Sequence, residues 1–168
     1  MILVAIFCAS LYLFYKRAQN SSAKQPLILT PAVINRPLPP SKLVNLSGEP
    51  LADEQVRRGK VVLVFMMPDC KPCDQEDEFL KTVVGRRQDV RFVYVIPFGN
   101  KEQALQSARS KYTLEPFFDV GSGLSRELEL NQVPVKVFLE DGIIKKTWLD
   151  AASADWEQTE FREWLSGL

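Results

Sequence analysis

The spacing of hydrophobic positions changes several times between residue 42 and the C-terminus. Continuous apolar runs at 60–67 and 90–97 are typical of strands buried on both faces of a sheet. Helical spacing follows the first run over residues 70–84, and a polar helix capped by Asn100 follows the second. Strand and helix signals that alternate in this way predict an α/β fold, with a mixed central sheet flanked by helices.

The clearest local signal is a hairpin near the C-terminus. Two apolar runs, 133–140 and 143–149, are separated by Asp141-Gly142, a pair that favours a tight two-residue turn. The remaining signals predict a hairpin over 42–51 around Ser47-Gly48, a short strand at Phe117-Phe118, a helix over 124–130 and an amphipathic helix over 155–165.

The N-terminal residues 1–15 are uncharged and almost wholly apolar, and Lys16 and Arg17 follow them. A helix of this length rises about 22 Å, which is short for a hydrocarbon core of about 30 Å. Snorkelling of the two basic side chains can close the gap, so we expect residues 1–17 to form a membrane anchor. A cleaved signal peptide, with Ser21-Ser22-Ala23 at the cleavage site, and a buried core helix are the alternatives.

Residues 18–41 contain five prolines and no helical or strand period, which predicts a semi-rigid tether. The folded domain is therefore expected over residues 42–168. The side of the membrane on which this domain lies is less certain from charge. Lys16 and Arg17 follow the anchor, and the positive-inside tendency would then place the domain in the cytoplasm, in conflict with a domain outside it.

Charge and composition exclude several functions. The chain carries 21 basic and 21 acidic side chains, so it offers no electrostatic footprint for nucleic acid. It contains no histidine, which excludes a Ser-His-Asp triad, a Cys-His nucleophile, an HExxH zinc site and a histidine-ligated haem. Acid-base chemistry must then use thiols, carboxylates, lysines, tyrosines or water.

The candidate chemistry lies in a Cys-x-x-Cys motif. Of the three cysteines, Cys8 lies in the apolar N-terminal run and is expected to be inert, whereas Cys70 and Cys73 follow a buried strand and begin a helix. Unpaired amides and the dipole at a helix N-terminus stabilise a thiolate. We therefore expect Cys70 to be the exposed nucleophile and Cys73 to be the shielded thiol that resolves the mixed disulfide.

Neighbouring charges leave the acidity of Cys70 open, because Asp69 raises the pKa of its thiol and Lys71 lowers it. Two structural alternatives for the cysteine pair also stay open. These are a structural disulfide and half of a zinc site completed by another chain. We expect neither a metal nor a cofactor in the chain itself.

Several segments together resemble a known family: residues 59–65 (GKVVLVF), Cys70-Lys71-Pro72-Cys73, Glu76, Val133-Pro134 and residues 138–142 (FLEDG). Over residues 42–168 the chain resembles the bacterial membrane-anchored thioredoxin-like proteins of the TlpA and ResA type. Pro68-Asp69-Cys70 is also similar to the thioredoxin-like proteins that assist maturation of methylamine dehydrogenase. The resemblance implies a thioredoxin-like fold and a thiol-disulfide oxidoreductase that acts on protein substrates.

The resemblance also assigns roles to single residues. It implies that Pro134 is a cis proline facing the cysteines and that the backbone of Val133 pairs with the substrate. We also assign Lys71 and Pro72, which lie between the cysteines, to substrate binding, together with Val133 and Pro134. Glu76 matches a glutamate that such proteins carry three residues after the second cysteine, so it is the candidate proton acceptor.

The family's pattern is not complete in this chain. Thioredoxin itself has a buried aspartate at the position of Val64, so proton transfer to Cys73 needs another group. The competing interpretation of Glu76 is that Asp74, Glu76, Asp77 and Glu78 form a solvated acidic first turn, which the helix dipole favours.

The family implies a reductive direction, in the maturation of cytochromes or metalloenzymes, with the domain outside the cytoplasm, in the periplasm. Its partners would be protein thiols and disulfides, and a membrane electron-donor protein or membrane complex. The sequence does not determine the direction of exchange, because a change of about 30 mV in potential is worth only about 1.4 kcal/mol. The alternative function is a membrane-tethered binding or assembly subunit in which the cysteines are structural or vestigial.

Overall fold

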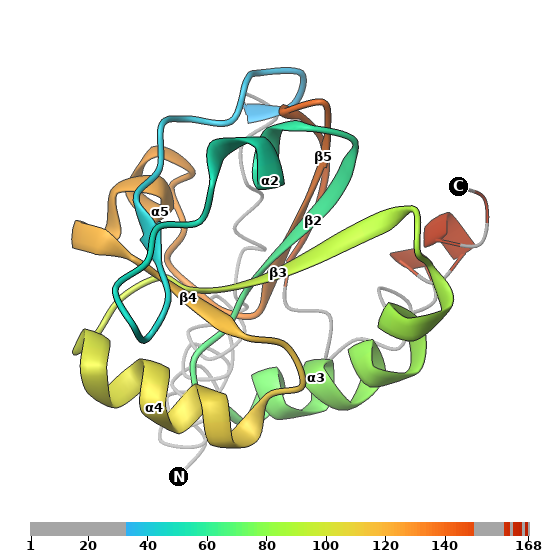
Figure 1. Cartoon of the computed structure of the whole chain (residues 1–168). Helices are drawn as coiled ribbons and strands as arrows, with labels where there is room; N and C mark the ends of the chain where they lie inside the picture. The colour runs from blue at the N-terminus through green and yellow to red at the C-terminus, as the bar shows by residue number, and fades with distance from the viewer. Residues whose placement is uncertain (1–32, 150–159, 162, 166, 168) are drawn as a thin grey trace, which may run out of the picture.

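The computed structural model describes residues 33–149, 160, 161, 163–165 and 167, and shows one six-stranded sheet with helices on both faces (Figure 1). The strands, in spatial order, are β1 (Leu43–Val44), β4 (Pro116–Asp119), β3 (Val90–Ile96), β2 (Lys60–Phe65), β5 (Val135–Glu140) and β6 (Ile143–Leu149). The helices are α2 (Asp53–Arg57), α3 (Lys71–Val83), α4 (Lys101–Lys111) and α5 (Gly123–Glu127), with short 3₁₀ turns η2 (Val84–Arg86) and η3 (Val120–Ser122).

The sheet is mixed, as the sequence predicts. β2 lies near its centre, parallel to β3 and antiparallel to β5. β3 is also parallel to β4, and the two edge strands, β1 and β6, pair in antiparallel fashion with β4 and β5. The continuous apolar run in β2 follows from this position, because a central strand covered on both faces exposes neither set of side chains: Val61 to Phe65 are all fully buried.

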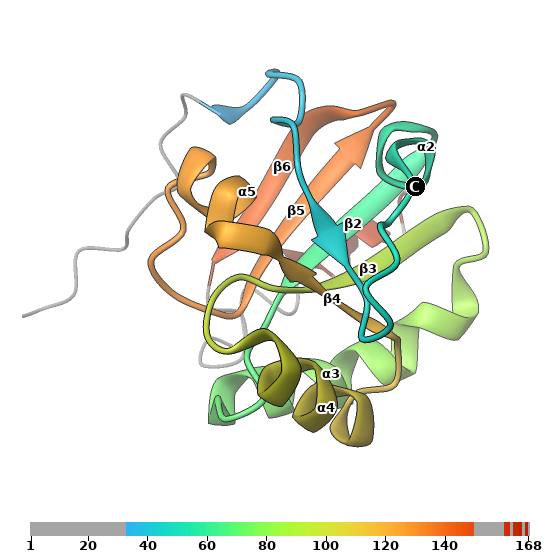
Figure 2. The same cartoon turned by 60° about the vertical axis from the view of Figure 1, so that its left-hand side comes forward.

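Two layers of helices cover the sheet. α3 and α4 bury Leu80 and Leu105 on one face, where they pack on Val62, Val64 and other side chains of the sheet. α2 and α5 cover the opposite face, and Figure 2 shows them on the other side of the strands from α3 and α4. The apolar residues at helical spacing in the sequence are therefore the ones that join each helix to the sheet.

The predicted C-terminal hairpin is confirmed by the pairing of β5 with β6. Asp141 and Gly142 both adopt positive φ angles, 49° and 76°, as a type I′ turn requires. The turn also contacts the segment before β2, where the Gly59 amide donates to the Asp141 carboxylate over 2.9 Å.

The structure corrects the expected boundary between tether and domain. Residues 33–41, which the sequence places in the tether, pack on the sheet, with Val33 and Leu38 buried in the core. Their backbone is also bonded to the hairpin, because Asn35 N donates to the Ile144 carbonyl and Leu38 N to the Gly142 carbonyl. The folded unit therefore includes residue 33 and does not begin at residue 42.

Other elements differ in length or were not predicted. The helix α2 has no counterpart in the sequence prediction, and α5 ends at Glu127 although the pattern predicts a helix to residue 130. Residues 42–51 do turn back on themselves, through a bridge between Val44 and Pro50, but β1 is part of the main sheet through its pairing with β4.

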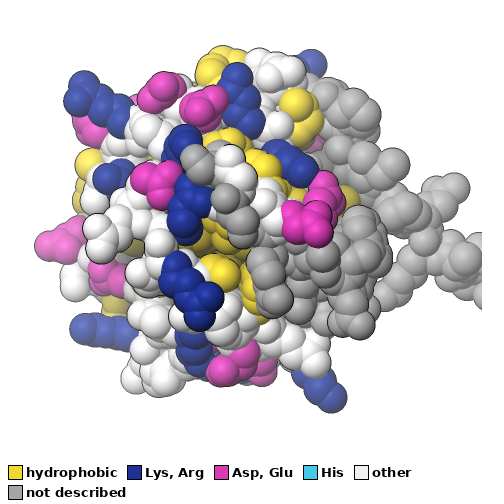
Figure 3. All heavy atoms as spheres, turned by 90° about the vertical axis from the view of Figure 1, so that its right-hand side faces the viewer, with side chains coloured by type: hydrophobic (Ala, Val, Ile, Leu, Met, Phe, Trp, Pro, Cys, Tyr) yellow, Lys and Arg dark blue, Asp and Glu magenta, His cyan; other side chains and the backbone are white. Residues whose placement is uncertain are grey.

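The predicted membrane anchor, residues 1–17, lies outside the described residues, as do residues 18–32 of the tether and most of the helix predicted over 155–165. Within the described part of the chain, no helix has the length and apolarity that a membrane crossing requires. The face drawn in Figure 3 carries basic and acidic side chains side by side, in agreement with the equal numbers of the two charges in the whole sequence.

Candidate active site

The two cysteines of the motif meet at the N-terminus of α3. They form a disulfide, with an S–S distance of 2.15 Å and a Cα–Cα distance of 5.1 Å. Cys70 is the N-cap residue of the helix, and its sulfur accepts a hydrogen bond from the Cys73 amide over 3.2 Å. Cys73 is fully buried, whereas Cys70 is partly exposed. The structure thus gives the two sulfurs the unequal access that the sequence predicts.

The segment before β5 lies against this disulfide. The peptide bond between Val133 and Pro134 is cis, as the family resemblance implies. The Val133 carbonyl oxygen lies 3.9 Å from the Cys70 sulfur, Val133 is partly exposed and Pro134 is buried. Lys71 is exposed and Pro72 partly exposed between the cysteines. Six of the predicted substrate-contacting and redox residues therefore converge, although some 60 positions separate the two segments that carry them.

The loop that leads into Cys70 is held by the C-terminal end of α4. The Lys111 ammonium donates to the Pro68 carbonyl and forms an ion pair with Asp74 over 2.7 Å. The Tyr112 hydroxyl donates to the Met67 carbonyl. These contacts fix the loop backbone on one side of the disulfide.

The acidic residues of α3 divide into two groups. Asp74 and Glu78 are partly or fully exposed, as a solvated acidic turn predicts, but Glu76 and Asp77 are buried, with exposed fractions of 0% and 3%. The solvated interpretation is therefore wrong for Glu76. Its Oε1 accepts from the Lys136 ammonium of β5 over 2.8 Å, and Lys136 is also buried.

The neighbouring carboxylate, Asp77, has partners of its own. Its Oδ1 accepts from the Tyr94 hydroxyl of β3 over 3.0 Å, and its Oδ2 lies 3.0 Å from the Lys81 ammonium. Burial, followed by the nearby charge of Asp77, raises the pKa of Tyr94 well above that of a free tyrosine. Burial likewise raises the pKa of Tyr112. Both phenols are thus neutral hydrogen-bond donors at the pH of most cells.

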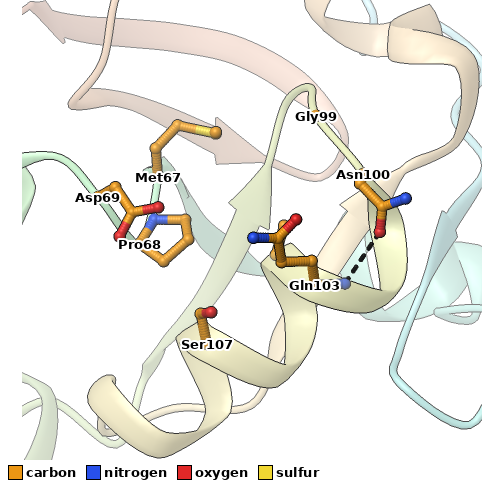
Figure 4. A pocket seen from close by; sticks show the side chains of 8 residues that line it. Met67, Pro68, Asp69, Gly99, Asn100, Gln103 and Ser107 are labelled. Atoms are coloured by element: carbon orange, nitrogen blue, oxygen red, sulfur yellow. Dashed lines mark hydrogen bonds between the residues drawn. The ribbon is translucent and has the colours of Figure 1, made fainter.

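An open pocket of about 130 Å³ lies beside Asp69, the residue that precedes Cys70. Figure 4 shows Met67, Pro68 and Asp69 on one side of it, and side chains from the start of α4 on the other. The α4 side is lined by Gly99, Asn100, Gln103, Ala104 and Ser107. Among the described residues, the lining mixes apolar side chains with uncharged polar ones, and Asp69 supplies the one carboxylate.

Sequence reasoning missed Lys136, Asp77 and Tyr94. Only Lys136 carries a signal of its own, because it is the one charged residue within the apolar stretch 135–139. No group of three or more cysteine and carboxylate residues that could hold a metal occurs among the described residues. Cys70 and Cys73 are instead bonded to each other.

Comparison with known proteins rests on structure, since no family model matches the chain and no curated protein matches it in sequence. A secreted disulfide oxidoreductase of Mycobacterium tuberculosis, described as homologous to Escherichia coli DsbE, superposes with a TM-score of 0.62 and 25% identity. That match covers 76% of this chain and 95% of the other.

Two further solved structures are similar to the chain. The thioredoxin domain of a Bacteroides vulgatus thiol-disulfide oxidoreductase gives a TM-score of 0.60 and 15% identity, over 79% of this chain and 97% of that one. StoA from Bacillus subtilis gives a TM-score of 0.53 and 21% identity, over 64% of this chain and 85% of that one.

The chain has a thioredoxin-like fold. Structural neighbours with this fold include thiol-disulfide oxidoreductases, and the Cys70–Cys73 disulfide lies at the start of the helix that follows the central strand. At these identities the likeness shows the thioredoxin-like fold, and the chemistry has to be argued from the residues of the site.

Proposed function

We propose that this chain is a thiol-disulfide oxidoreductase that exchanges disulfides with protein substrates through Cys70 and Cys73. One observation carries the proposal. The two sulfurs form a disulfide at a helix N-terminus, where one is partly exposed and the other is fully buried. A disulfide with one accessible sulfur and a shielded neighbour has the arrangement that a two-step exchange needs.

The first step uses the exposed sulfur. In the reduced protein the Cys70 thiolate, stabilised by the amides and dipole at the start of α3, attacks one sulfur of the substrate disulfide. A bond forms between Cys70 and that sulfur, the substrate S–S bond breaks, and the other substrate sulfur leaves as a thiolate that takes a proton from water. The product is a mixed disulfide between the substrate and Cys70.

The second step uses the buried sulfur. Cys73 gives up its proton and attacks the Cys70 sulfur, so that the intramolecular disulfide re-forms and the second substrate sulfur leaves as a thiolate, which is then protonated. Two electrons and two protons pass to the substrate in the complete cycle. We assign the proton acceptor to Glu76, a buried carboxylate one helical turn beyond Cys73.

Substrate binding is assigned to the surface around Cys70. The exposed Lys71 and partly exposed Pro72 and Val133 surround the sulfur, and Val133 offers backbone groups to an extended peptide. Pro134 lies buried behind them and shapes that surface. The pocket beside Asp69 adds space for a neighbouring side chain of the substrate.

We further propose a reductive direction and a membrane-anchored protein of the TlpA and ResA type, with its domain outside the cytoplasm, in the maturation of cytochromes or metalloenzymes. The apolar run 1–15 supports the anchor, and the likeness to a secreted Mycobacterium tuberculosis disulfide oxidoreductase supports the compartment. A reductive cycle leaves the protein oxidised, so it requires a reductant, and we assign that role to a membrane electron-donor protein as a second partner.

The test is to trap the mixed disulfide. In a chain that carries Cys8→Ser, we expect Cys73→Ser to accumulate mixed disulfides with partner proteins, because Cys70 attacks a partner's disulfide and the resolving sulfur is absent. The adducts should disappear on reduction and should be absent from the matched Cys70→Ser variant. Electrophoresis with and without reductant detects the adducts in each variant, and mass spectrometry identifies the trapped proteins.

The same experiment separates the alternatives. If Cys73→Ser forms no more adducts than Cys70→Ser, the cysteines are structural and the binding or assembly function is favoured. The trapped proteins also report the compartment. Partners that reside outside the cytoplasm are expected, and cytoplasmic partners would contradict the proposed orientation.

A further inference from the structure

A buried ion pair lies behind the cysteines, between Glu76 of α3 and Lys136 of β5. The two charged groups are 2.8 Å apart, and both side chains have exposed fractions of 1% or less. Burying two charges costs free energy that their attraction only partly returns, and apolar residues of the same size often stabilise a core equally well. Stability alone therefore does not account for this pair.

The pair joins the two segments that form the active site. Glu76 follows Cys73 by three residues on α3, so both fully buried side chains lie on the same face of the helix. Lys136 follows the cis Val133–Pro134 peptide by two residues, in the strand that pairs with β2. Its partner in that register is Val64 of β2, the strand that leads into the Cys70 loop.

The surroundings distinguish Glu76 from its neighbour Asp77. Both oxygens of Asp77 are engaged, one by the Tyr94 hydroxyl and one by Lys81. Glu76 uses only Oε1, for Lys136, and its buried Oε2 has no hydrogen-bond partner among the described residues. The Lys136 ammonium also lies 5.0 Å from the centre of the Phe161 ring, near the C-terminus. An unengaged oxygen on an ionised carboxylate is free to receive a proton.

We propose that Lys136 is a positioning residue for disulfide exchange, and that its bond to Glu76 Oε1 orients the carboxylate so that Oε2 takes the proton of Cys73. The inference rests on the proposed function. During resolution the S–H bond of Cys73 breaks, its proton passes to Glu76 Oε2, and its electron pair forms the bond to Cys70. The bond between Cys70 and the substrate sulfur breaks, and that sulfur leaves with its bonding pair. Glu76 later returns the proton to water.

Removal of the lysine has a specific consequence. Without the Lys136 ammonium, the Glu76 carboxylate loses the hydrogen bond that holds Oε1, so Oε2 is no longer held in place to accept the proton of Cys73. The attack by Cys70 does not involve Glu76 and is left unchanged. The defect should also shrink as the pH rises, because hydroxide can then take the proton of Cys73 in place of Glu76.

The experiment mixes the reduced full-length chain, carrying Cys8→Ser, with one equivalent of dithiobis(nitrobenzoate). Cys70 attacks this small disulfide and releases one coloured thionitrobenzoate, and Cys73 then releases the second. The first phase of colour therefore measures attack, and the second measures resolution. We expect Lys136→Met to slow the second phase at pH 7 about tenfold or more, a part of the roughly 10²–10⁴-fold that a general base contributes, and to leave the first phase unchanged.

Three variants complete the design. Glu76→Gln should show the same selective defect, and Glu76→Gln/Lys136→Met should be no slower than Glu76→Gln alone, because the lysine acts through the glutamate. Lys81→Met, which removes the lysine beside Asp77, is the matched control and should leave both phases unchanged. If Lys136→Met does not fold, the comparison of the double variant with Glu76→Gln decides the question.

The outcomes separate this inference from the function on which it rests. A second phase that is unchanged in Lys136→Met, a loss that is equal in both phases, or a double variant slower than Glu76→Gln would overturn the role of Lys136. If the wild-type chain releases both thiolates and Glu76→Gln resolves as fast, exchange stands and the inference fails. If the wild-type chain never releases the second thiolate, the proposed function itself fails.

Discussion

At the scale of single residues, Tyr94 illustrates how burial changes the chemistry of a side chain in this core. Its hydroxyl donates to the buried Asp77, and burial raises the pKa of the phenol. The unfolded chain loses the phenolic proton near pH 10, whereas the folded chain keeps it. The contribution of Tyr94 to the free energy of unfolding is therefore fully present below about pH 10 and is lost as the pH rises further.

Substitution Tyr94→Phe should change stability in two ways. At neutral pH we expect a loss of about 1 kcal/mol, because one buried hydrogen bond is removed. Above about pH 10 the fall in stability should become shallower, because only Tyr112 still contributes to it among the described tyrosines. Urea unfolding followed by circular dichroism between neutral and alkaline pH measures both effects, and parallel curves for the two proteins would refute the assignment.

The sequence identifies the cysteines of the site but not their buried support. Cys70 and Cys73 could be predicted because a short motif, a preceding strand and a helix start lie within a few residues of each other. The partner of Glu76 could not, because Lys136 lies 60 positions away and meets Glu76 only when β5 pairs with β2. A lone charge inside an apolar strand is the signal that could have raised the question earlier.

At the scale of elements, periodicity predicts the long helices and strands well. β2, β3, α3, α4 and the hairpin of β5 and β6 all lie where the spacing of apolar residues predicts them. The helix α2 has five residues, too few to display a helical period, and so was not predicted. The prolines of residues 33–41 predict a tether, yet Val33 and Leu38 of this segment are buried on the sheet.

The turn between β5 and β6 supplies an element-scale prediction. Gly142 has a φ angle of 76°, and a Cβ atom at this position would lie 3.3 Å from the Cβ of Arg57 in α2. We expect Gly142→Ala to lower the free energy of unfolding by about 1–2 kcal/mol, because alanine is strained in this conformation. Urea unfolding measures the loss.

The matched control is Gly85→Ala, at a turn with no positive φ angle and with open space around the added Cβ. It should be neutral or stabilise the protein by up to about 1 kcal/mol, since alanine reduces the entropy of the unfolded chain. Equal losses in the two variants would show that the turn geometry is not the cause.

At the scale of the whole molecule, the site exists because of the strand order. β2 delivers Cys70 and Cys73 to the start of α3, and β5, next to β2 in the sheet, brings Val133 and Pro134 to the same end. Hydrophobic patterns predict the strands but not which strands lie side by side in the sheet. The meeting of the cysteines with Val133 and Pro134 could therefore be expected only from the family resemblance. The covering layer of α3 and α4 then buries Cys73 and leaves Cys70 partly exposed.

The central claim is that Cys70 and Cys73 cycle between disulfide and dithiol in the folded protein. The most direct measurement equilibrates the full chain, carrying Cys8→Ser, with glutathione buffers of increasing reducing power, and counts free thiols while circular dichroism reports the fold. We expect both thiols to appear together in one reversible transition, with the spectrum of the folded protein retained. A disulfide that opens only when the protein unfolds would contradict the account.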